Sequence, residues 1–285
     1  MNVVTAILDF VILVVVALVP AVGYLAWVKR SERFSPEPWR TLLGPFAYGA
    51  FFATVIAGIL EAILVGVGTA ASQAIPAPEF TFLNGNSTAG EFFLILVIAP
   101  FIEEALKGSG VYAYRAQLRG PADGPVFGAS VGLGFGFFET LLYGVGAFAV
   151  GGLVAGIALI AIRSVSSVLL HGASTGIFGY GFARSRFHLP GPGTGSYYLV
   201  AVGMHAAFNA LASLAAIVAI FGITGVTITL ATWIGLVAAI AFVFLAIEHV
   251  RELIQASSYP AIALGSARYQ PKGGTRPAAA PVRKK

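Results

Sequence analysis

The chain has 285 residues, of which 58% are hydrophobic and only 10% are charged, with a net charge of +5. Soluble domains are usually about a quarter charged, so this composition excludes an ordinary soluble protein. The absence of cysteine excludes disulfides, thiolate nucleophiles and cysteine metal ligands. Several apolar runs of about 20 residues instead predict a polytopic helical membrane protein.

We expect an all-α bundle of transmembrane helices, because the apolar runs are long and show no strand-like alternation. In chain order, the seven expected spans are residues 4–28, 41–67, 90–113, 125–148, 161–183, 196–220 and 224–249. The first run is not typical of a cleavable signal peptide, because no basic segment precedes it and it carries Asp9.

Lysine and arginine alternate between the expected loops. They occur at 29–40, 114–122 and 184–195 and after the last span, whereas 68–89, 149–160 and 221–223 contain none. The positive-inside rule therefore predicts an N-terminus outside and a C-terminus in the cytoplasm. We expect residues 1–250 to form one membrane domain and 251–285 a basic cytoplasmic tail, disordered from about residue 266 because it is rich in Pro, Ala, Gly and basic residues.

The third expected span contains the unusual sequence "EEALK" at 103–107. A charge at the bilayer centre costs at least ~2.5–3.5 kcal/mol on insertion scales, so Glu103, Glu104 and Lys107 are expected to face the bundle interior. Lys107 is an i,i+4 neighbour of Glu103 and an i,i+3 neighbour of Glu104. The lysine can therefore neutralise one glutamate while the other faces a cavity.

Other polar residues fall in the middle of spans four, five and six. They are Glu139, His171, and the pair His205 and Asn209, which lie one helical turn apart. Counting ~1.5 Å per residue from the span ends places Glu103, Glu139, His171 and His205 at similar depths in a core of ~30 Å. We predict that four helices direct these groups to one buried site, and that Arg163 extends toward the outer membrane surface.

These residue types restrict the chemistry. The chain lacks a clearly spaced Ser–His or Ser–Lys pair, paired aspartates and HExxH. A glutamate can act as a general base on water while His and Asn stabilise an oxyanion. Alternatively, Glu139, His171 and His205 can ligate Zn²⁺ and leave one position for water. Both alternatives lead to peptide hydrolysis inside the membrane; a transporter or proton relay is the competing function.

Four motifs in order carry a family resemblance: "EEALK" at 103–107, "FGFFE" at 135–139, the Arg163-to-His171 segment with "HGASTGIFGYGFA", and "HAAFN" at 205–209. Together they resemble the PrsW family of intramembrane proteases, which is distantly related to the CAAX prenyl proteases. The resemblance covers a motif core of about residues 90–215.

The resemblance implies a role for each of these residues. Glu103 would be the water-activating base, Glu104 would pair with Lys107, Glu139 and His171 would line the site, and His205 and Asn209 would polarise the carbonyl or bind metal. CAAX relatives have a histidine where this chain has Glu139, which leaves the choice between metal and glutamate open. The expected partners are the lipid bilayer of the bacterial plasma membrane and a membrane-protein substrate, such as a single-span anti-sigma factor, and no nucleic acid.

Overall fold

The computed structural model describes residues 2–32, 36–75 and 82–258, and these residues contain helices and no strand, which confirms the all-α prediction. The helices are α1 (Val3–Lys29), α2 (Trp39–Ala47), η1 (Tyr48–Ala53), α3 (Thr54–Ala74), α4 (Thr88–Phe93), η3 (Leu94–Ile98), α5 (Ala99–Ala113), η4 (Arg115–Gln117), α6 (Asp123–Ser164), α7 (Ser167–Arg186), α8 (Thr194–Ala212), α9 (Leu214–Ile220) and α10 (Val226–Ser257). The predicted tail start at residue 251 falls inside α10, and residues 266–285 lie outside the described part.

Four helical stretches of the described chain are long and apolar enough to cross a membrane. They are Val3–Lys29, Trp39–Ala74, Asp123–Arg186 and Val226–Ser257. A fifth is obtained if α8 and α9, which are bent by 68° relative to each other, form one span. The helix that carries Glu103, Glu104 and Lys107 is not among them. Length and composition thus establish four or five candidate spans, fewer than the seven expected.

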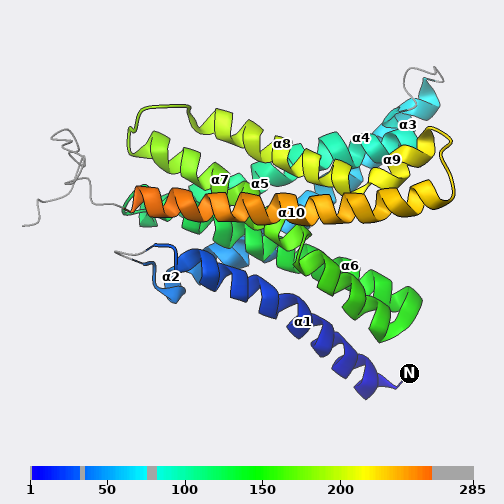
Figure 1. Cartoon of the computed structure of the whole chain (residues 1–285), viewed down its shortest axis with the longest axis horizontal. Coiled ribbons are helices and arrows are strands. Elements are labelled where there is room, and N and C mark those ends of the chain that lie inside the picture. Colours follow the sequence, from blue (N-terminus) through cyan, green and yellow to red (C-terminus); the bar gives the residue numbers. More distant parts are fainter. Residues whose placement is uncertain (1, 33–35, 76–81, 259–285) are drawn as a thin grey trace, which may run out of the picture.

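The stretch Asp123–Arg186 is 64 residues long, about 96 Å as a straight helix and therefore about three times the thickness of a bilayer core. It does not run straight, because Gly152 breaks the helical geometry with φ 75° and ψ −173°. Positive φ is readily available to glycine, so the chain can fold back at this position. Figure 1 shows the green ribbon of α6 turning back on itself before it reaches α7.

Glycines bring α6 and α7 into direct backbone contact. Gly124, Gly128 and Gly132 recur every four residues and therefore lie along one face of α6. A Cβ at Gly128 or Gly132 would overlap the carbonyl oxygen of Thr175 or His171, respectively. Small residues at this spacing allow transmembrane helices to approach closely. This contact fixes the height of His171 relative to α6.

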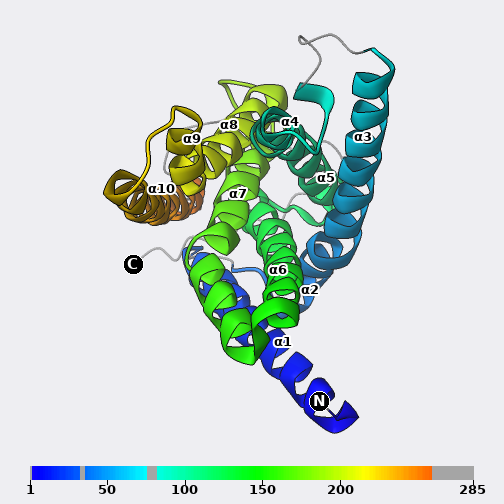
Figure 2. The ribbon, with the colours of Figure 1, turned by 90° about the vertical axis from the view of Figure 1, so that its right-hand side faces the viewer.

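Helix α7 is the centre of the fold. It packs against α6, α8, α10 and α5 (Figures 1 and 2). The largest apolar core joins α1, α6, α7 and α10 and includes Leu25, Phe127, Leu169 and Ile247, each at most 2% exposed. Because α5 and α8 pack on the same central helix, side chains from α5, α7 and α8 can meet inside the bundle.

A buried carboxyl group in the loop after α1 is expected to make the stability of the folded protein depend on pH. Burial raises the pKa of Glu32 from 4.5 to about 7, and repulsion by Asp123 and Glu37 adds to the rise. The folded protein therefore binds this proton more tightly than the unfolded chain, so the stabilisation is complete below pH 4.5 and is lost as the pH rises through 7. We expect the unfolding temperature to fall from pH 5 to pH 8 more steeply in the wild type than in Glu32→Gln. If the unfolding temperature fell equally steeply with pH in both proteins, the raised pKa of Glu32 would be contradicted.

Candidate metal centre and active site

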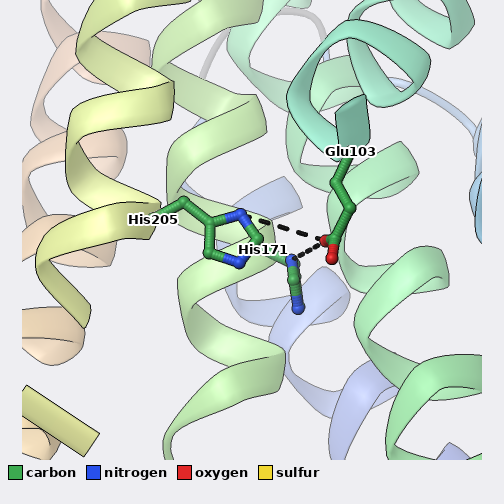
Figure 3. Close-up of side chains that lie close together, drawn as sticks. All are labelled: Glu103, His171 and His205. Carbon is green, nitrogen blue, oxygen red and sulfur yellow. Dashed lines mark ion pairs between the residues drawn. The ribbon is translucent and has the colours of Figure 1, made fainter. Parts of the chain in front are cut away.

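Three helices direct one acidic and two imidazole side chains toward a single point. Glu103 comes from α5, His171 from α7 and His205 from α8 (Figure 3). The Oε2 atom of Glu103 lies 3.8 Å from Nδ1 of His171 and 3.9 Å from Nδ1 of His205. All three residues are buried, and one ligand atom of each lies within 4.8 Å of the others. Among the described residues, these three form the group whose geometry could hold a metal ion.

Lys107 lies beside this group and is among the largest fully buried side chains of the described residues. Its Nζ donates to Oε1 of Glu104 at 2.7 Å and to Nδ1 of His171 at 2.8 Å, and lies 3.5 Å from Oε2 of Glu103. Glu104 is thus the closer partner of the lysine, in agreement with the expected pairing. Oε1 of Glu104 also accepts from Ser174 at 3.1 Å and lies 3.0 Å from Nδ1 of His205.

Glu139 lies on the opposite edge of the His171 ring. Its Oε2 is 2.9 Å from Nε2 of His171 and 2.7 Å from Nη2 of Arg163, which also donates to Ser167. A lysine ammonium can only donate, so Nδ1 of His171 must accept from Lys107, and in the neutral ring Nε2 carries the proton. Glu139 therefore fixes the tautomer in which Nδ1 accepts from Lys107, on the side of the ring that faces Glu103.

Asn209 is the predicted site residue that points elsewhere. Its Nδ2 donates to the carbonyl oxygen of Ile95 at 2.6 Å. Ile95 belongs to η3, a π-helical segment in the same helical run as α5. The described contact of Asn209 therefore joins α8 to η3, one turn away from His205. We call the residues that do meet the polar cluster: Glu103, Glu104, Lys107, Glu139, His171 and His205.

The acidic member of the candidate metal group differs from the one predicted. The sequence suggested Glu139, His171 and His205, whereas the described structure groups Glu103 with the two histidines. The reason is electrostatic, because Glu139 is held by Arg163. Arg163 was expected to extend to the membrane surface, but it lies on the returning arm of α6 and pairs with Glu139. Sequence analysis also missed Ser167 and Ser174, which have no distinctive spacing.

The donor set of the cluster fits a divalent metal ion. One carboxylate and two imidazoles are a typical protein ligand set of a catalytic zinc site, which keeps a further position for water. Oε2 of Glu103 is buried and accepts no hydrogen bond among the described residues. A carboxylate on the far nitrogen of a ligating histidine, the position that Glu139 occupies, is also a regular feature of such sites.

Comparison with known proteins agrees with this geometry. A model of the family described as "PrsW family intramembrane metalloprotease" matches residues 37–247, which include the whole polar cluster. Protease PrsW of Bacillus subtilis (strain 168) is 25% identical over 174 residues, which cover 60% of this chain and 67% of the relative. Protease PrsW of Shouchella clausii (strain KSM-K16) is 30% identical over 134 residues, 46% of this chain and 54% of the relative. No solved structure matches the chain.

These matches identify the activity class. The chain is an integral protein of the bacterial membrane and a peptidase whose substrates are membrane proteins. They do not favour the alternative of a transporter or proton relay. Since the match spans α5 to α8, the helices that carry Glu103, His171 and His205, the chain belongs to the PrsW family of intramembrane metalloproteases.

Proposed function

We propose that the protein is a zinc-dependent intramembrane protease in which Glu103, His171 and His205 hold the ion. The observation that carries the proposal is the convergence of these three buried side chains from three helices. When bound, zinc supplies Lewis-acid activation of water and of the scissile carbonyl. Glu139 and Arg163 would keep His171 in the required tautomer and orientation.

We assign proton transfer to Glu104. Its Oε1 is held by Lys107, Ser174 and His205, while Oε2 is buried and accepts no hydrogen bond among the described residues. A carboxylate fixed by one oxygen can accept the proton of the attacking water with the other and pass it to the leaving amine. This assignment moves the role of the base, which the resemblance implied for Glu103, to Glu104, and Glu104 keeps its pairing with Lys107.

The finer topology is part of the proposal. Seven crossings, with the N-terminus outside and the C-terminus in the cytoplasm, are supported by the lysine and arginine content of alternate loops. Residues 1–250 would then be the protease domain, and residues 251–285 would follow it on the cytoplasmic side. In this arrangement the polar cluster lies near mid-membrane, and Arg163 and Glu139 lie on its outer side.

The proposed substrate is a single-span membrane protein, and an anti-sigma factor is the substrate that the family resemblance implies. A substrate with one transmembrane helix has a short segment that can be unfolded locally to expose its backbone to Glu104. Peptide bonds in an intact helix are shielded by their own hydrogen bonds, so unwinding must precede cleavage.

Metal analysis tests the zinc assignment directly. We expect the purified full-length protein to bind one zinc ion per chain, and cleavage of a single-span substrate in liposomes to rise in proportion to zinc occupancy after chelation and reloading. The physical reason is that the described residues contain one set of three groups that could hold the ion. Full activity in protein that chelation has freed of metal would refute the zinc mechanism and leave the glutamate-only one.

A further inference from the structure

A cavity of about 340 Å³ opens between α5, α7 and α8, next to the polar cluster. Its walls include Glu104, Ala105, Gly108, Phe178, Phe182 and Tyr198, and we call it the side pocket. We propose that the side pocket binds a large apolar side chain of the substrate next to the scissile peptide bond. The inference rests on the proposed function, because it places the substrate backbone beside the cluster.

Glu104 connects the side pocket to the chemistry. This residue lines the cavity and is only 1% exposed, and its carboxylate lies 3.0 Å from His205 and 2.7 Å from Lys107. A substrate residue whose side chain enters the cavity therefore has its backbone within reach of the polar cluster. The side pocket would thus determine which peptide bond of the substrate lies beside the catalytic groups.

The shape of the pocket favours a large apolar side chain. Phe178 and Phe182 stack with ring centroids 6.4 Å apart, and a Cβ at Gly108 would lie 2.9 Å from the Phe178 ring. Glycine at this position therefore lets an aromatic wall lie against α5. The volume is near the lower end of the ~300–1,000 Å³ typical of ligand pockets, which suits a side chain rather than a whole helix.

A peptide suits this site better than a lipid tail. A hydrocarbon chain in the side pocket would lie beside Glu104 and would offer no hydrogen-bond donor to this residue, whose Oε2 has no partner among the described residues. A peptide brings N–H groups together with the apolar side chain. Since lipid tails are as apolar as the pocket, selection among side chains must come from packing and shape rather than from the hydrophobic effect.

Filling or widening the pocket tests the proposal. Ala105 is exposed on α5, so Ala105→Phe can fold normally and fill the cavity, whereas Phe182→Ala widens it. The substrates are single-span proteins in liposomes that carry Ala, Leu or Phe next to the mapped cleavage site. We expect Ala105→Phe to lower kcat/KM for the Leu and Phe substrates about 10-fold relative to the Ala substrate. We expect Phe182→Ala to raise kcat/KM for the Phe substrate relative to the other two substrates.

The matched control is Ala113→Phe, the same substitution at an exposed position of α5 outside the side pocket. Its substrate preference should equal that of the wild type. If Ala105→Phe lowers cleavage of all three substrates equally, or of none, the side pocket does not bind the substrate side chain, and a lipid tail becomes its occupant.

Crosslinking separates this inference from the proposed function. A photoreactive group on the flanking substrate residue should label peptides containing Phe178, Phe182 or Tyr198, in the wild type and in the inactive Glu103→Gln variant alike. Labelling elsewhere would overturn the side-pocket assignment even if cleavage depends on zinc. Conversely, metal-independent cleavage together with labelling at these residues would refute the zinc mechanism and retain the pocket.

Discussion

Replacing Glu103 with glutamine is expected to reduce cleavage of a single-span substrate to background and to abolish the proposed zinc binding. Glutamine keeps the shape of the side chain but loses the charge, and Oε2 of Glu103 is the buried carboxylate oxygen facing both histidines, at 3.8 and 3.9 Å. The measurements are kcat/KM in liposomes and zinc per chain by mass spectrometry, with membrane insertion checked separately.

The adjacent glutamate is the matched control. Glu104→Gln should retain zinc, because Glu104 is outside the three-residue metal group, yet lose about 10²–10⁴-fold in kcat/KM, the usual contribution of a general base. Retention of zinc by Glu103→Gln together with its loss in Glu104→Gln would reverse the two assignments. Normal cleavage by Glu103→Gln would refute the site itself.

Introducing a single methyl group at Gly132 is expected to cost about 100-fold in kcat/KM, because a displacement of about 1 Å of a catalytic group has an effect of this size. A Cβ at Gly132 would overlap the carbonyl oxygen of His171, so Gly132→Ala must push α7 and its histidine away from Glu103. We also expect a lower unfolding temperature, measured in the same detergent as the wild type.

Gly58→Ala provides the comparison for Gly132→Ala. Gly58 lies in α3, where an added Cβ would contact no atom within 4 Å. Alanine also has the higher helix propensity, so this variant should keep wild-type activity and an equal or slightly higher unfolding temperature. Equal behaviour of the two variants would show that the close contact between α6 and α7 does not position His171.

The sequence predicts every member of the polar cluster, because ionisable residues are costly in lipid and therefore stand out in an apolar span. The similar depths of Glu103, Glu139, His171 and His205 indicate that their helices bring these groups together. Depth alone does not specify rotation about a helix axis. It therefore could not show that Glu103 rather than Glu139 faces the Nδ1 atoms of the histidines, or that Asn209 turns to Ile95.

The pairing of Arg163 with Glu139 needed information that spans and depths do not contain. Both residues belong to α6, and they meet because the chain folds back at Gly152. An arginine near a span end is usually explained by an extended side chain that reaches the surface. The contact between α6 and α7 was not predicted either, although glycine at 124, 128 and 132 is a regular small-residue repeat that favours close helix packing.

The buried ammonium of Lys107 bears on the order in which the enzyme is assembled. Within the polar cluster and its Arg163 partner, the three carboxylates of Glu103, Glu104 and Glu139 face two cationic side chains, so at most one negative charge is in excess. Most of the cost of placing acids in lipid is therefore offset within the polypeptide itself. Under the proposed zinc mechanism, translocation and folding need not wait for the ion. Metal delivery is then a separate maturation step that can hold a fully inserted protease inactive until the ion is supplied.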